Sequence, residues 1–195
     1  MTMTLADIRL LVRRDLCDED EAVRRWSDDS LDRHIRHALA DISAGAPLEA
    51  AVLVATSAGS REIDISGIAG MYRVNAVEYP PGWRRRFTCW GEAVRLMDGT
   101  LPDGSPALVE CYVAYEISDE GSTIPAPLAD LLTLGAEGYA CLELAGYTVN
   151  RINAGGTGTP LDYQRLGEAR LAFFRAEITR LGPGGSLRMA ELYRE

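Results

Sequence analysis

The chain has 195 residues, 47% of them hydrophobic, and a formal net charge of −9, with no lysine among its 20 basic residues. This length and composition fit one domain with a hydrophobic core, and no apolar run approaches the ~18 residues that a membrane span requires. The negative charge argues against sequence-independent binding to nucleic acid, which needs basic side chains facing phosphates.

The N-terminus and the cysteines indicate a protein made in the cytoplasm. The first seven residues lack both the basic region and the apolar run of a secretory signal. The cysteines are scattered, without CxxC spacing or histidines at ligand spacing, so we expect buried free thiols rather than a zinc site or disulfides. They are Cys17, Cys89, Cys111 and Cys141.

A first amphipathic helix is predicted over about residues 4–16. Thr4 is expected to cap it, with Asp7 completing a capping box. Apolar residues recur at helical spacing on one face. The arginines expected to point to solvent are Arg9, Arg13 and Arg14.

A second helix, predicted over about residues 27–44, has the clearest local signal. The Ser27 hydroxyl can accept a hydrogen bond from an unpaired backbone N–H, and two aspartates follow in the positively polarised first turn. Trp26, just before the cap, is placed to pack back as a hydrophobic staple. Leu31 and Ile35 belong to the apolar face, so all four residues are expected to be structural.

The middle of the chain, about residues 50–117, changes to a strand pattern. Six short runs rich in β-formers are separated by glycine- and proline-containing turns. No helical pattern fits between them, which favours antiparallel hairpins in a small sheet. The predicted strands are 51–56, 61–65, 71–79, 86–90, 94–97 and 108–115.

Two further helices are predicted over about 126–148 and 160–181. Small residues in the former indicate close packing against a neighbouring helix. Between them lies a glycine-rich segment, 153–158, which is read as an interhelical loop rather than a phosphate cradle because it follows a helix and lacks GK[ST]. The expected fold is α+β: a four-helix bundle with an inserted small antiparallel β-sheet, forming a single domain over 1–181, and an extended C-terminal tail over 182–195.

No catalytic constellation stands out. His34 and His37 lie three apart with Asp41 nearby, but a metal site needs more ligands. No titratable nucleophile is paired with a base. The chain is therefore expected to be neither an enzyme nor the holder of a cofactor or metal.

The segment from Pro80 to Trp90 is the most unusual stretch of surface, because Trp83 is followed directly by Arg84, Arg85 and Arg86. Three interpretations stay open. The arginines can be solvated residues of a strand, they can bind carboxylates of a protein partner, or they can bind nucleic acid together with the aromatic side chains.

Resemblance adds a more specific interpretation. The Arg25–Leu31 segment with the apolar residues that follow it resembles the start of head-to-tail adaptor proteins of tailed bacteriophages, also called connector or head completion proteins. The similarity continues in the β-rich middle and in the Tyr112–Tyr115 segment, which leads through Ile124 and Pro125 to the small-residue helix. At the level of individual residues the resemblance is confined to the Trp-Ser-Asp region around Trp26 and to the junction between the last strand and the small-residue helix.

This resemblance implies a structural subunit of a homo-oligomeric ring, usually of about twelve copies, beneath the portal protein of a filled capsid. The ring would extend the DNA channel and receive a stopper or tail protein. DNA would pass through the lumen without being bound specifically. No association with a membrane is expected. The protein would be made in the host cytoplasm and end in the neck of the virion. The alternative is a small regulatory or nucleic-acid-associated domain that uses the segment from Trp83 to Trp90.

Two sets of contact residues follow from the resemblance. Trp83 and the three arginines after it are candidates for a contact with the neighbouring subunit or the next ring. The candidates for a portal-binding tail are Leu187, Arg188, Met189, Leu192 and Tyr193.

Overall fold

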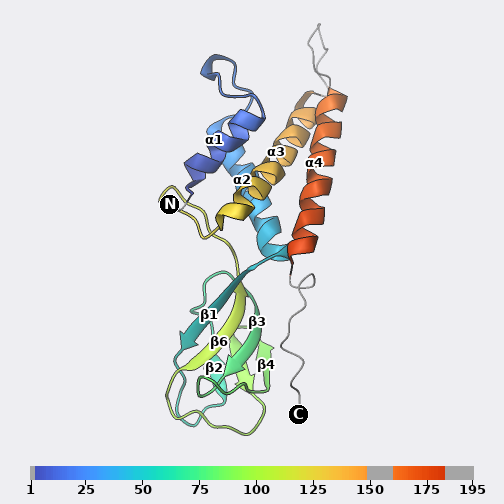
Figure 1. The fold of residues 1–195 in the computed structure, drawn as a ribbon. Helices are drawn as coiled ribbons and strands as arrows, with labels where there is room; N and C mark the ends of the chain where they lie inside the picture. The colour runs from blue at the N-terminus through green and yellow to red at the C-terminus, as the bar shows by residue number, and fades with distance from the viewer. Residues whose placement is uncertain (1–2, 149–159, 183–195) are drawn as a thin grey trace. The chain divides into compact units, whose positions relative to one another are not determined.

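A computed structural model describes residues 3–148 and 160–182 of the chain (Figure 1). These residues divide into two compact units. One, which we call the helical unit, comprises residues 3–46 with the described residues from 115 onward. The other, the sheet unit, comprises residues 47–114. The glycine-rich segment at 153–158 and the C-terminal tail after residue 182 lie outside the described residues.

Four α-helices and one short 3-10 helix make up the described part of the helical unit. They are α1 (Leu5–Asp15), η1 (Glu21–Val23), α2 (Asp28–Gly45), α3 (Ala126–Thr148) and α4 (Pro160–Leu181).

Both predicted N-terminal caps are confirmed. The Thr4 hydroxyl accepts a hydrogen bond from the Asp7 amide at 3.2 Å, and the Asp7 carboxylate accepts one from the Thr4 amide at 2.9 Å. At α2, the Ser27 hydroxyl accepts from the Ser30 amide at 3.2 Å. Each cap satisfies backbone donors that the first turn of a helix leaves unpaired.

Helix α3 is the centre of the helical unit, since it packs against α1, α2 and α4 (Figure 1). Small residues permit the close approach to α4. A Cβ added at Gly135 would lie 2.7 Å from the Phe174 ring, and one added at Gly138 would lie 2.7 Å from Leu171. The prediction of tight packing through small residues is therefore confirmed. The core of this unit includes the fully buried Phe174 and Leu132.

The sheet unit contains two three-stranded antiparallel sheets. The first has the strand order β1-β6-β3 and the second β2-β5-β4. Side chains from both sheets join in one hydrophobic core that includes Ile63, Val94 and Val109. The strands are β1 (Leu48–Val54), β2 (Glu62–Asp64), β3 (Met71–Glu78), β4 (Phe87–Trp90), β5 (Ala93–Leu96) and β6 (Ala107–Val113).

The predicted four-helix bundle with one small inserted sheet is wrong. The described residues have an α+β fold with about 45% helix and 22% strand, but the six strands form two sheets. A single small sheet would leave one face of these strands without cover, whereas two sheets bury their inner faces against a common core. The helices are arranged around α3, which is apolar around most of its circumference, as expected of a central helix.

Among the described residues, none of the helices is long and apolar enough to cross a membrane.

Candidate interaction surfaces

The segment from Tyr79 to Trp90, which we call the arginine turn, is a closed and well-connected piece of the sheet unit. The Tyr79 amide donates to the Trp83 carbonyl at 2.9 Å, and the Trp83 amide donates to the Pro80 carbonyl at 3.0 Å. Gly82 adopts a φ of 94°, a left-handed conformation that favours glycine. These hydrogen bonds close the backbone from Tyr79 to Trp83 into a tight turn.

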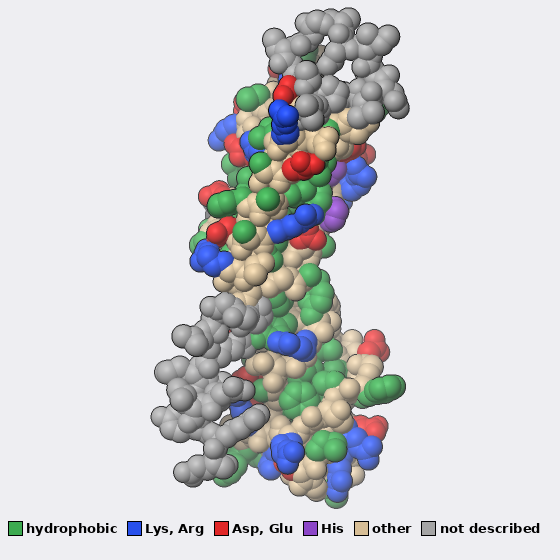
Figure 2. All heavy atoms as spheres, turned by 90° about the vertical axis from the view of Figure 1, so that its right-hand side faces the viewer, with side chains coloured by type: hydrophobic (Ala, Val, Ile, Leu, Met, Phe, Trp, Pro, Cys, Tyr) green, Lys and Arg blue, Asp and Glu red, His purple; other side chains and the backbone are tan. Residues whose placement is uncertain are grey.

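Two tryptophans of the arginine turn face solvent. Trp83 is 68% exposed and Trp90 is 90% exposed. Burying aromatic side chains of this size is strongly favourable, so their exposure marks a surface that suits a partner. On the face of the sheet unit shown in Figure 2, hydrophobic side chains lie beside basic ones.

Two of the three arginines already have carboxylate partners within the sheet unit. Arg84 donates to Glu110 at 3.0 Å. Arg85 donates to Asp98 at 3.2 Å and to the Tyr79 carbonyl at 2.5 Å. Arg86 is exposed and has no side-chain partner among the residues that the structure describes. Only one guanidinium of the run is thus free to bind a new anion.

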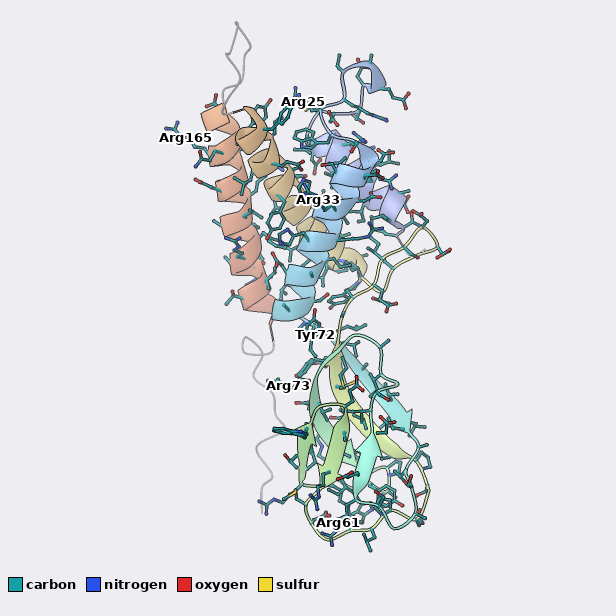
Figure 3. All side chains as sticks on the ribbon, turned by 180° about the vertical axis from the view of Figure 1, so that it is seen from behind. Arg25, Arg33, Arg61, Tyr72, Arg73 and Arg165 are labelled. Carbon is teal, nitrogen blue, oxygen red and sulfur yellow. The ribbon has the colours of Figure 1, made fainter. Side chains whose placement is uncertain are left out.

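Three other arginines belong to the sheet unit, and one of them, the exposed Arg95 of β5, lies opposite Thr88 of β4. Arg61 and Arg73 lie toward opposite ends of the unit (Figure 3), and Arg73 sits over the Tyr112 ring at 5.1 Å from its centroid. Sequence-independent binding of a phosphate backbone needs several free cations on one surface. Within the run itself, Arg84 and Arg85 do not supply them, because both are already paired with carboxylates.

The residues predicted to be structural occupy the core of the helical unit. Leu31 and Ile35 are fully buried, and Trp26 is 4% exposed. The Trp26 indole N–H donates to the Ala140 carbonyl of α3 at 3.2 Å, which places this side chain between the start of α2 and the central helix. Ser27 is the cap described above. The predicted portal-binding residues, 187–193, lie outside the described residues.

Sequence patterns missed a buried ionic cluster next to Trp26. Arg13 was expected to face solvent, but its side chain is only 3% exposed. It donates to Asp18 at 2.6 Å, to the Trp26 carbonyl at 3.1 Å and to Asp28 at 2.5 Å. Asp18 also accepts from the Arg25 amide at 2.6 Å. Arg13 therefore ties α1 to the loop after it and to the start of α2.

The two histidines occupy separate environments. The pKa of His34 is lowered, mainly because the ring is buried. The ring also contacts the Glu143 carboxylate. His37 stacks on the Tyr139 ring with centroids 4.0 Å apart, and the Tyr139 hydroxyl donates to Asp41. Within the described ranges, no group of three or more histidine, cysteine or acidic side chains is placed to hold a metal ion.

The cysteine prediction is partly wrong. Cys111 and Cys141 are buried free thiols, and burial raises the pKa of the Cys141 thiol to about 11. Cys17 and Cys89 are also free, but they are exposed.

A second surface, which no sequence pattern indicated, is a groove of about 650 Å³ in the helical unit, hereafter the α3–α4 groove. Apolar side chains from the first half of α3 and the last half of α4 line it. They are Pro127, Leu128, Leu131, Leu134, Phe173 and Leu181. Phe173 is 60% exposed and Leu181 is 41% exposed. The surface of the helical unit on the α4 side mixes hydrophobic and charged side chains (Figure 2).

Comparison of the sequence with protein-family models and with curated proteins gives no match.

Proposed function

We propose that this chain is a structural subunit of the head–tail connector ring of a tailed bacteriophage, acting through protein contacts rather than catalysis. The proposed class of protein, a head-to-tail adaptor, rests on the residue-level resemblance described above. The arginine turn supplies the observation that carries the proposal: Trp83 and Trp90 are exposed beside arginines that are mostly paired already. Tryptophans are enriched among the residues that contribute most to protein–protein contacts.

The same geometry favours a protein partner over nucleic acid. Arg84 and Arg85 are already neutralised by Glu110 and Asp98, so a phosphate backbone would have to compete with these carboxylates. Arg86 remains available for one bidentate ion pair with an acidic side chain of a neighbouring subunit. The alternative of a nucleic-acid-associated domain is weaker for this reason.

In the proposed assembly, copies of the chain close a ring through heterologous contacts. The ring would dock on the portal protein, extend the DNA channel and receive a stopper or tail protein. The net charge of −9 suits a lumen through which DNA slides without sticking. The tail residues proposed to bind the portal are Leu187, Arg188, Met189, Leu192 and Tyr193. The protein would reside in the neck of the virion.

Removing both exposed tryptophans is expected to weaken assembly without unfolding the chain. We expect the double variant Trp83→Ala, Trp90→Ala to bind the portal protein at least about thirtyfold more weakly, because a single large aromatic anchor contributes about 2 kcal/mol or more at a protein contact. Sedimentation velocity of the chain mixed with the portal protein of the same phage measures this.

The matched control is Tyr72→Ala, an aromatic side chain of the same unit that is 52% exposed and lies outside the arginine turn (Figure 3). This control should assemble like the wild type. If the double variant assembled as well as the wild type, the arginine turn would not be part of the interface. A salt-sensitive affinity for duplex DNA that is lost in Arg86→Ala would favour the nucleic-acid alternative.

A further inference from the structure

The α3–α4 groove has an apolar floor and an unbalanced negative rim. Two of its charged pairs are internal: Arg170 contacts the buried Glu137 carboxylate, and Arg180 donates to Glu177 at 2.7 Å. Asp15 and Asp130, which also line the groove, form no ion pair with the residues that the structure describes. The groove therefore fits a short apolar segment that carries a positive charge.

One segment of this chain has that chemistry and starts beside the groove. Leu181 both ends α4 and lines the groove, and the sequence continues through Gly182-Pro183-Gly184-Gly185 to Ser186-Leu187-Arg188-Met189. Glycine and proline at these positions are typical of a turn that reverses the chain. An arginine between two large apolar residues matches a groove with an apolar floor and two carboxylates on its rim.

The distances allow the segment to fold back. Phe173 precedes Leu181 by eight residues, which is about 12 Å along a helix. The six steps from Leu181 to Leu187 span up to about 20 Å when extended. In an extended segment Leu187 and Met189 point to the same side, so both can enter the groove while the long Arg188 side chain turns to the rim.

We propose that the α3–α4 groove binds residues 187–189 of its own chain in the free subunit. A linker this short gives an effective concentration in the millimolar range, which favours the chain's own segment over one from another molecule. Asp15 or Asp130 binds Arg188, and Phe173 covers Met189. This contact does not depend on the ring proposed above.

The test is a methyl NMR spectrum of the full chain labelled at its methionines. The chain has five, so the Met189 signal can be assigned from a Met189→Leu variant. We expect the Met189 methyl resonance to be displaced by the Phe173 ring relative to a synthetic peptide of residues 183–195, and to show a nuclear Overhauser effect to aromatic protons. In Phe173→Ala the resonance should return to the peptide position.

The control is Leu166→Ala, because Leu166 is a 43% exposed side chain of the same helix that does not line the groove. It should leave the Met189 resonance unchanged, and the displacement should be independent of protein concentration. Phe173 is mostly exposed, so its replacement leaves the helical circular dichroism intact. A wild-type resonance at the peptide position, or a displacement that survives Phe173→Ala, would overturn the proposal. A displacement that grows with concentration would assign the groove to a second copy instead.

Discussion

Replacing Arg13 by alanine is expected to lower the free energy of unfolding of the helical unit by about 3–5 kcal/mol, because a buried ion pair that loses one partner leaves an uncompensated charge. The charge left behind is that of Asp18, whose side chain is only 1% exposed. The Trp26 carbonyl and Asp28 lose a donor at the same time. Urea denaturation followed by circular dichroism at 222 nm measures the loss.

Arg14 is the matched control for this experiment. It is the next residue of α1, but its side chain is 68% exposed and its distance to Glu19 is 3.9 Å. Exposed ion pairs contribute about 0–1 kcal/mol, so Arg14→Ala should leave the denaturation curve nearly unchanged. Similar losses for Arg13→Ala and Arg14→Ala would mean that the ionic cluster does not hold α1 to α2.

Replacing Trp26 by alanine should destabilise the same unit to a similar degree, by about 3–5 kcal/mol for loss of a large buried aromatic side chain. Trp26 is 4% exposed, and its indole donates to the Ala140 carbonyl of the central helix. Trp26→Phe keeps much of the apolar contact but removes this hydrogen bond. The unfolding free energy should therefore fall less in Trp26→Phe than in Trp26→Ala. Thermal and urea unfolding of both variants give the comparison.

Trp90→Ala provides the contrast, since Trp90 is 90% exposed and contributes little to the folded core. We expect its unfolding free energy to stay within about 0.5 kcal/mol of the wild type, as for most surface substitutions. Replacing Trp26 therefore tests the stability of the fold, whereas replacing Trp90 tests the proposed contact with a partner. If Trp26→Ala proved as stable as Trp90→Ala, the core position assigned to Trp26 would be wrong.

The helix starts were predictable because their signals are local. Thr4 with Asp7 and Ser27 with its following aspartates satisfy backbone donors within three residues, so neither depends on distant parts of the chain. The small residues of α3 were equally informative, because close helix packing excludes larger side chains at Gly135 and Gly138.

The arrangement of the strands was not predictable by the same means. Alternating patterns place the strands but do not say which ones pair, and β6 pairs with both β1 and β3, which lie far from it in the sequence. The sequence pattern predicted antiparallel hairpins in one small sheet, without a strand order. The observed second sheet pairs β5 with β2 and β4, and its buried Ile63 and Val94 face the common core.

Long-range charge pairing also escaped the sequence. Arg9 and Arg13 were both expected to face solvent, but Arg9 is partly buried in an ion pair with Asp32. Helical spacing alone does not separate Arg13 from the exposed Arg14. Asp18 is one of four consecutive acidic residues, and only the structure shows that it is the buried one that pairs with Arg13. For the arginine turn the run itself was visible, but the pairing of Arg84 with Glu110 depends on β6 lying beside it.

The sheet unit and the helical unit thus present surfaces of different kinds. The arginine turn carries two exposed tryptophans, and two of its three arginines are paired with carboxylates, which suits a contact between subunits. The α3–α4 groove is apolar with an acidic rim, which suits the segment that follows α4. Variants at Trp83 and Trp90 test the first surface, and variants at Phe173 test the second, so the two proposals stand or fall separately.

Electron microscopy of the purified chain mixed with the portal protein of the same phage is the most direct test of the proposed function. We expect a ring of additional density on one end of the portal, with a central channel wide enough for duplex DNA. Monomers of the chain alone are compatible with this expectation, because docking can precede ring closure. Portal particles that carry no ring at any ratio of the two proteins, at low and at physiological salt, would contradict the connector function.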